Sequence, residues 1–452
     1  MNATERLLVL CTLATHQPGE VAEASRLALD RIDWNLFHDL AEVNATGPLV
    51  WKNLGALGHR DRVPAPLRAR FEARAAAIRE ANAARLTNAR ELFARFAGRH
   101  IPVVILKGVL FAETIYRDPS YKKMNDVDIL IRMHDLDAIY DIYQEMRFFS
   151  AAALVGGSPR RQEKFSHHAP PFFSRDLKLM VGTHWGLITP LAPYTIDYHA
   201  IWSRVVDVDF YGYPAKAMAP EDNLHHLCVH LPYYKCGLRE LADIYNLVRH
   251  QPIDWDLFAA EMTRAKTENL VYHALSLAHR ICPMPALAAA IARARPGTSS
   301  YFRHDAERKC ASISRLLRGR STHLSTIEKA YTDLQTTNAP VEKWGAYRRL
   351  WSGILFAPRQ DVLKMNALEE VGRIRLGGAR LQAPWRVYRV FARDVGGAIF
   401  VAILAKCAYD CLRATVTAPF AGPDSRRATF ESFARDLGVS VAQLEQLKNA
   451  LE

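Results

Sequence analysis

The fold of this chain is decided by the stretch Val103–Ile131, which begins with the apolar run Val-Val-Ile-Leu, continues through Lys107 and Gly108, and ends in Asp126-Val-Asp-Ile-Leu-Ile. Both apolar runs have the length and composition of buried strands. Side chains alternate between the two faces of a strand, so Asp126 and Asp128 are expected on one face. Two carboxylates this close need a compensating charge, which Mg2+ supplies through oxygen ligands. The pair therefore predicts a catalytic metal clamp, although two solvated acids on a half-buried strand would give the same pattern.

A phosphate-binding turn is predicted where the first strand ends. A glycine such as Gly108 lets backbone N–H groups approach a phosphate closely at the positive end of a new helix. Lys107 places a cation at that same helix end, which is unfavourable unless an anion lies nearby. A bound triphosphate would be such an anion, whereas an ordinary strand-to-helix turn is the simpler alternative.

A longer ordered series of residues accompanies this stretch, over about residues 30 to 290 and more loosely to about 400. Besides Leu106 to Gly108 and the two aspartates, it comprises Tyr116, Asp118-Pro119, Met124, His184-Trp185, Trp202, Pro220 to Leu224, His230, Leu238-Arg239 and Asp243. In order and spacing, the series resembles the uncharacterised nucleotidyltransferase-like proteins of bacteria, which are often encoded beside polysaccharide or peptide natural-product genes. The resemblance implies Mg2+ as cofactor, an NTP donor such as ATP, and a triphosphate seated by Lys107 and Gly108 with help from Lys122 or Lys123.

The chain departs from the family's pattern around the aspartate pair. Lys122 stands where family members usually carry an arginine, and Asn125 stands where they usually carry a glycine. Lysine keeps the positive charge but loses the planar fork that suits phosphate. We therefore expect weaker phosphate recognition at Lys122 than an arginine would give.

A second departure concerns the third carboxylate that nucleotidyltransferases generally use to bind metal and activate the acceptor hydroxyl. Family members commonly carry it two residues before the histidine, where this chain has Gly182. His184, Asp176 and Asp197 are candidates to replace it, and the sequence does not choose among them. His184 suits a catalytic general base because its ordinary pKa lies near neutrality. A structural histidine bonded to a backbone carbonyl is the alternative.

Two histidine pairs invite a metal hypothesis that the spacing supports only weakly. His167 and His168 are adjacent, so on a strand their side chains would face opposite ways. His226 and His230 lie four apart on one helical face, as zinc ligands can. However, there is no intervening glutamate base and no evident third ligand. Packing of this helix against the sheet is the favoured role of His230 and its leucine neighbours.

Composition sets limits on class and location. The chain has 452 residues, 49% of them hydrophobic, which is enough for a substantial core in two or three domains. Its seven cysteines are scattered and odd in number, so we expect reduced thiols and a cytoplasmic protein. The net charge of +12 favours an anionic partner, but no nucleic-acid-binding motif is present, so nucleic acid is not expected. No apolar run suggests a transmembrane span, while the amphipathic segment from Pro384 leaves a peripheral membrane contact open.

Helical and strand patterns divide the chain into regions. The predicted regions are an N-terminal helical region at 1–98, the core at 99–215, a helical region packed on the core at 216–295, a basic helical region at 296–417 and a two-helix tail at 425–452. The first region ends in a long helix from Leu67 to Phe96. The third contains a helix over 222–248 in which Arg239 pairs with Asp243 at i,i+4. In the fourth, three aromatic residues from Trp344 to Trp351 are expected to pack together.

The sequence thus predicts an α+β protein in which a small mixed β-sheet nucleotidyltransferase-like core is flanked by extensive helical regions. The predicted activity is Mg2+-dependent transfer of a nucleotidyl group from an NTP to a small molecule, sugar or peptide. Two alternatives remain. One is a catalytically degenerate nucleotide-binding or scaffold protein of a biosynthetic pathway, and the other is a transferase of a different group that uses the same metal site.

Overall fold

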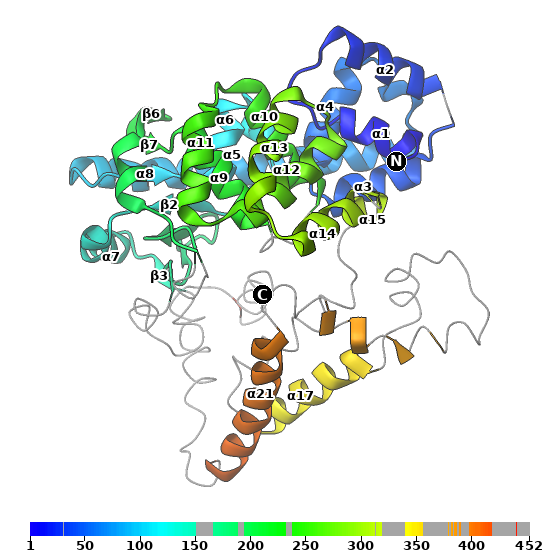
Figure 1. Cartoon of the computed structure of the whole chain (residues 1–452). Helices are drawn as coiled ribbons and strands as arrows, with labels where there is room; N and C mark the ends of the chain where they lie inside the picture. The colour runs from blue at the N-terminus through cyan, green and yellow to red at the C-terminus, as the bar shows by residue number, and fades with distance from the viewer. Residues whose placement is uncertain are drawn as a thin grey trace. The chain divides into compact units, whose positions relative to one another are not determined.

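The structure is a computed structural model of the chain (Figure 1). It describes residues 1–29, 31–150, 166–188, 194–231, 237–311, 313–318, 340–355 and 397–417, together with a few positions between 378 and 389 and position 440. The chain forms two compact units, the first made of Met1–Ala153 and Ser158–Gly319, and the second of Leu154–Gly157 and Arg320–Glu452. Apart from Ser440, the predicted tail at 425–452 lies outside the described residues.

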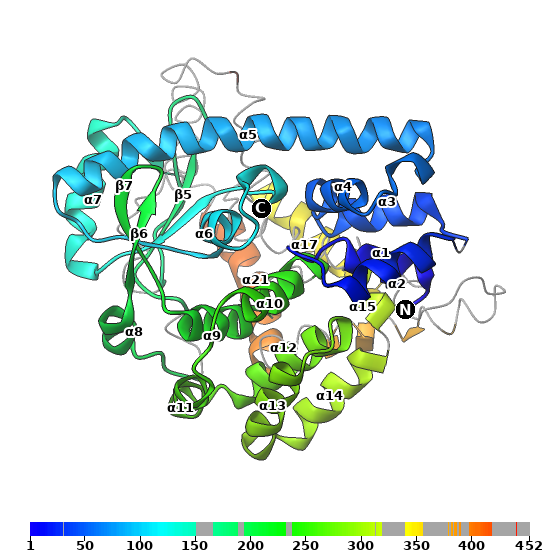
Figure 2. The same ribbon diagram turned by 90° about the horizontal axis from the view of Figure 1, so that it is seen from above.

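The first unit contains a seven-stranded mixed sheet, which lies toward one side of it (Figure 2). Its strands are β1 Val104–Ile105, β2 Val127–Leu130, β3 Phe149–Ser150, β4 Phe172–Phe173, β5 Met180–His184, β6 Val206–Phe210 and β7 Tyr213–Ala217. Their order across the sheet is β3-β4-β5-β2-β1-β7-β6. The pairs β2–β5 and β1–β7 are parallel and the other neighbours are antiparallel. This mixed sheet, flanked by helices, confirms the predicted α+β fold.

The register of the central strands places the aspartates. Val127 and Ile129 of β2 are fully buried on one face of the sheet, so Asp128 lies on the other. Across the parallel pair, Asp128 stands opposite Gly182, and Leu130 stands opposite His184. The second aspartate and the histidine therefore come from adjacent strands of the same sheet.

Helices surround this sheet in the first unit. They are α1 Ala3–Leu10, α2 Pro18–Leu29, α3 Trp34–Val43, α4 Gly47–Ala56, α5 Ala65–Gly98, α6 Lys107–Thr114, α7 Leu136–Glu145, α8 Tyr198–Arg204, α9 Pro220–His230, α10 Leu238–His250, α11 Trp255–Ala265, α12 Glu268–Ile281, α13 Pro285–Ala294, α14 Ser300–Ala311 and α15 Ile313–Leu317. Short 3-10 turns are η1 Arg60–Arg62, η2 Pro119–Tyr121, η3 Met133–Asp135 and η7 Arg295–Gly297.

The prediction of one continuous helix over 222–248 is wrong, because α9 and α10 are separate helices.

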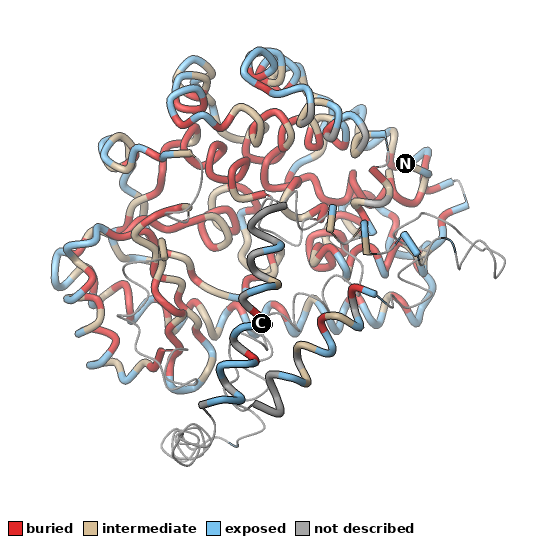
Figure 3. Tube along the Cα trace, turned by 60° about the horizontal axis from the view of Figure 1, so that its bottom comes forward, coloured by how far each residue is buried: buried red, intermediate tan, exposed pale blue. Residues whose placement is uncertain are grey.

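The long helix α5 ties the N-terminal helices to the sheet. It has 34 residues and lies against α3 and α4 over part of its length and against α7 and β7 over another part (Figure 2). Its buried residues include Leu86, Leu92, Phe93 and Phe96, the stripe expected from helical spacing. Buried residues recur along the inward sides of these helices (Figure 3). One apolar core therefore runs through the N-terminal helices and the sheet.

The second unit contains two described helices that pack on each other, α17 Pro340–Leu355 and α21 Gly397–Thr417. The ring of Trp344 makes an edge-to-face contact with Tyr347, with the centroids 5.6 Å apart. Tyr347 makes a second edge-to-face contact with Trp351, with the centroids 6.2 Å apart. This confirms the predicted aromatic packing. Trp344 also donates a 2.9 Å hydrogen bond from its indole N–H to the hydroxyl of Thr415 on α21. Among the described residues, neither these helices nor any other is both long and apolar enough to cross a membrane.

Candidate active site

The predicted metal clamp lies at a cavity of about 460 Å3 where β2, β5 and α6 meet. Asp126 and Asp128 both line this cavity, together with Lys107 and His184. The backbone N–H of Leu106, at the end of β1, donates a 2.9 Å hydrogen bond to the carbonyl of Asp128. The structure therefore brings together four of the predicted site residues. Lys107 comes from the start of α6, the two aspartates come from β2 and the residue directly before it, and His184 comes from β5.

Lys107 is the first residue of α6, and its backbone is unusual. Its φ is +23°, at the edge of the left-handed region that residues with a Cβ rarely occupy. Gly108 does not have a positive φ, and a Cβ added there would meet nothing within 4 Å. The glycine thus leaves open space beside the start of α6, although it does not line the cavity. The backbone strain is at the lysine, which the sequence pattern did not predict.

The Asp128 carboxylate is held from both sides. Its Oδ2 lies 3.5 Å from the ammonium of Lys107, and its Oδ1 lies 3.3 Å from Nε2 of His184. Burial alone would raise the pKa of Asp128, but the charge of Lys107 and the hydrogen bond with His184 outweigh it and hold the pKa well below its usual range. Asp128 is therefore ionised, and Nε2 of His184 donates to it.

Asp126 has the opposite electrostatics. Burial, and next the negative charge of Asp128, raise the pKa of Asp126 to about 6. Nearby cations, including Lys107 and Arg85 of helix α5, lower it by less. At Asp126, burial and the neighbouring carboxylate therefore outweigh the nearby cations.

Gly182 explains how Asp128 reaches its position. A Cβ added at Gly182 would lie 2.2 Å from Oδ1 of Asp128 and 3.2 Å from Nε2 of His184. The space that a third acid would need is therefore filled by the Asp128 carboxylate. Any larger residue at 182 would push that carboxylate away from His184.

Of the three candidates to replace the acid at position 182, one lines the cavity. Asp176 accepts hydrogen bonds from Ser174 and from the backbone of Lys178 in the turn before β5. Asp197 caps the start of α8 and pairs with an arginine on α11. His184 lines the cavity and contacts Asp128. The geometry therefore favours His184 over the two aspartates.

Three further histidines line the cavity and were not predicted there. His167 and His168 both do so, with their rings 4.5 Å apart and nearly perpendicular, although strand alternation suggested opposite directions. His230, at the end of α9, is the third, and its ring lies 5.3 Å from that of His226. Burial lowers the pKa of His167 to about 3 and also lowers the pKa values of His168, His226 and His230. These imidazoles are neutral at physiological pH.

The donor set fits Mg2+ brought by a phosphate better than an all-protein metal cage. No group of three or more histidine, cysteine or carboxylate side chains among the described residues is arranged to hold a metal ion. Mg2+ commonly binds through one or two carboxylates and takes its other ligands from water and substrate phosphates. Asp126 and Asp128 match that pattern, and a bound cation would stabilise the ionised form of Asp126, which burial disfavours.

The family comparison agrees with this geometry. A model of a family described as uncharacterised nucleotidyltransferases matches residues 30–283, which is more than half of the chain and includes every residue of the cavity. The chain belongs to this nucleotidyltransferase family. No match was found among curated proteins or among solved structures.

Several residues of the nucleotidyltransferase pattern form a buried brace rather than the cavity wall. The ammonium of Lys122 lies 2.7 and 2.6 Å from the two carboxylate oxygens of Asp243, and the hydroxyl of Tyr116 donates to the same carboxylate at 2.8 Å. The predicted Arg239–Asp243 pair is not what forms, because Asp243 binds Lys122 while Arg239 binds Glu240. The brace anchors the segment before β2 to α10.

The brace changes the interpretation of the two lysines assigned to the triphosphate. Lys122 is buried in the ion pair, and neither Lys122 nor Lys123 lines the cavity. Lys123 is half-buried near the cations Arg74, Arg239 and Arg85, and burial, followed by those charges, lowers its pKa. A triphosphate role for either lysine stays a prediction.

Proposed function

We propose that this member of the family is a metal-dependent nucleotidyltransferase that uses an NTP, with ATP as one candidate, and transfers its nucleotidyl group to a small-molecule, sugar or peptide acceptor. The observation that carries the proposal is the convergence of Asp126, Asp128 and Lys107 on one cavity at the start of α6. Acidic and cationic groups side by side suit a metal–triphosphate substrate. Mg2+ held by Asp126 and Asp128 would neutralise charge on the reacting phosphate and lower the pKa of the acceptor hydroxyl.

The chain's own residues account for orientation and charge. In the proposed step, the acceptor oxygen forms a bond to the α-phosphorus, the bond from that phosphorus to the bridging oxygen breaks, and pyrophosphate leaves. Lys107 and the first N–H groups of α6 face the phosphates with positive charge. Open space beside Gly108 lets the phosphate approach the backbone.

The hydroxyl proton needs an acceptor, and His184 is the proposed one. Its Nε2–H is directed to the ionised Asp128, so the neutral ring keeps Nδ1 as its proton-accepting atom. Asp128 would stabilise the imidazolium that forms, as a carboxylate does for a general-base histidine. In this proposal His184 takes the place of the carboxylate that Gly182 lacks.

One observation favours a second candidate, a nucleotide-binding protein without turnover. Both oxygens of Asp128 are already engaged, by Lys107 and by His184, and glycine stands at position 182, where family members commonly carry the third acid. A degenerate site of this kind would bind nucleotide without transferring it. A transferase of another group would need the same metal site.

Calorimetry with ATP, GTP, CTP and UTP, with and without Mg2+, tests the proposal. The native protein is compared with Asp126→Asn/Asp128→Asn and with Asp141→Asn, which removes an exposed acid of α7. We expect Mg2+-dependent binding of at least one nucleotide, lost in the double variant and kept in the control. Pyrophosphate release in the presence of cell extract then separates transfer from binding alone. Binding of no nucleotide under any condition would contradict an NTP site.

A further inference from the structure

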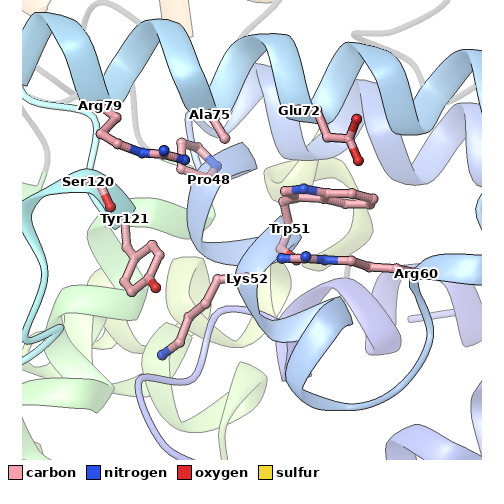
Figure 4. Close-up of a pocket in the computed structure, with 9 residues that line it drawn as sticks. All are labelled: Pro48, Trp51, Lys52, Arg60, Glu72, Ala75, Arg79, Ser120 and Tyr121. Carbon is pink, nitrogen blue, oxygen red and sulfur yellow. The ribbon is translucent and has the colours of Figure 1, made fainter.

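A second cavity in the first unit lies apart from the carboxylates, between α4, α5 and η2 (Figure 4). Its volume is about 240 Å3, and none of the residues that line it lines the first cavity. Three cations line it, Lys52, Arg60 and Arg79, against a single carboxylate, Glu72. The cavity is therefore strongly positive.

Arg60 is fixed in place before any ligand arrives. Its guanidinium lies 4.6 Å from the ring centroid of Trp51, and its Nε donates a 3.1 Å hydrogen bond to the carbonyl of the same residue. A Cβ at Gly55 would come within 2.7 Å of that guanidinium, so the glycine makes room for it. The indole ring also stacks on Phe71, with the ring centroids 5.4 Å apart. Trp51 is thus already in contact with both a guanidinium and an aromatic ring.

The ammonium of Lys52 is half-buried, and no carboxylate among the described residues forms an ion pair with it. Its ammonium lies over the ring of Tyr121, 4.9 Å from the centroid (Figure 4). Burial lowers the pKa of Lys52, and the carboxylate acting on it, Asp118, opposes this by less. A desolvated cation whose close contact among the described residues is an aromatic ring is stabilised by an anion placed next to it.

We propose that this cavity binds a compact phosphorylated ligand, either inorganic phosphate or the phosphate group of a small monoester. Its volume lies below the roughly 300–1,000 Å3 typical of pockets for drug-sized ligands. Arginine and lysine together are the usual donors to phosphate oxygens, and the hydroxyl of Ser120 lies at the same cavity wall. Recognition is by charge, because three of the lining side chains are cations.

The site adjoins the segment that leads to the carboxylates. Ser120 and Tyr121 belong to η2, whose ends are held by Asn82 of α5 through 2.8 Å hydrogen bonds to the carbonyls of Pro119 and Lys122. Asp126 follows five residues after Tyr121. A phosphate contacting η2 therefore stabilises the start of the catalytic segment.

The first test is calorimetry with inorganic phosphate and with glycerol 3-phosphate, in low salt and with EDTA so that no metal contributes. The native chain is compared with Lys52→Gln/Arg79→Gln and with Arg70→Gln/Arg90→Gln, which removes two exposed charges from α5 outside the cavity. Loss of charged hydrogen bonds should weaken binding about tenfold or more in the first variant, with less than about a twofold change in the control. Equal weakening in both variants would overturn the proposal.

A second test uses the native chain alone, so it does not depend on the variants folding. Lysines are acetylated with and without inorganic phosphate, and the rate at Lys52 is followed by mass spectrometry. We expect phosphate to slow acetylation of Lys52 several-fold while the exposed Lys178 is unaffected. An unchanged rate at Lys52 would refute the site. Tighter binding of glycerol 3-phosphate than of phosphate would identify a monoester as the ligand, and the reverse would identify the free anion.

Discussion

Replacing Asp126 by asparagine is expected to stabilise the metal-free protein at neutral pH. In the folded state burial and the charge of Asp128 raise the pKa of Asp126 from its ordinary 3.8 to about 6. The fold therefore favours the protonated carboxyl. The stability that this proton gives is fully present below pH 3.8 and is lost as the pH rises through about 6. Asparagine keeps the size and polarity of the side chain but cannot ionise.

The size of the effect follows from the same pKa. A difference of about two pH units, at about 1.4 kcal/mol each, corresponds to about 3 kcal/mol at pH 7.5. This is an upper bound, because Asp126 lines a cavity that admits water. Near pH 4 the native carboxyl is largely protonated in the folded state, so the two proteins should differ little.

Urea unfolding in EDTA at pH 4 and pH 7.5 measures this directly. We expect Asp126→Asn to gain free energy of unfolding over the native protein only at the higher pH, while the exposed control Asp141→Asn gains none at either. Mg2+ should then raise the stability of the native protein more than that of the variant. A variant that is no more stable at pH 7.5 would refute the claim that burial and Asp128 disfavour the ionised form of Asp126.

Two further substitutions probe the surroundings of the site. Lys122→Met leaves the buried carboxylate of Asp243 without its cation and should lower the free energy of unfolding by about 3–5 kcal/mol. The control Lys123→Met, at the half-buried neighbouring lysine, should lower it much less. Similar losses for the two variants in urea unfolding would show that the brace is unimportant. Gly182→Ala places a Cβ 2.2 Å from the Asp128 carboxylate, so we expect about 1–3 kcal/mol of destabilisation and weaker Mg2+-dependent nucleotide binding by calorimetry. Native-like values for both quantities would mean that Asp128 rotates freely.

Local pattern was sufficient to predict the central strands β1 and β2 and the aspartate pair, whereas the strands β3, β4, β6 and β7 were not predicted. The alternation in 127–131 correctly buried Val127 and Ile129 and turned Asp128 to the other face, because a strand's period is fixed by its backbone. The apolar spacing of α5 was equally clear. The gathering of Lys107, Asp128 and His184 at one cavity follows in the structure from the adjacency of β1, β2 and β5 in the sheet.

Long-range partners were not predictable in the same way. Lys122 and Asp243 are 121 positions apart, and nothing in the local sequence of either indicates that they meet. The direction of His167 and His168 depends on how the chain bends before β4, where regular alternation does not apply. The break between α9 and α10 did leave a signal, because the sequence carries Pro232 and Gly237 inside the supposed helix.

The positive φ of Lys107 implies a trade between folding and activity at a single residue. A backbone angle that only glycine adopts comfortably costs free energy, and such costs concentrate where a side chain must be aimed at a fixed point. Here the aimed group is the ammonium that reaches Asp128. Selection for stability alone would place glycine or asparagine at this position. We therefore expect that a screen for substitutions that raise the melting temperature will select replacements of Lys107 early, and that these replacements will remove the cationic end of the cavity.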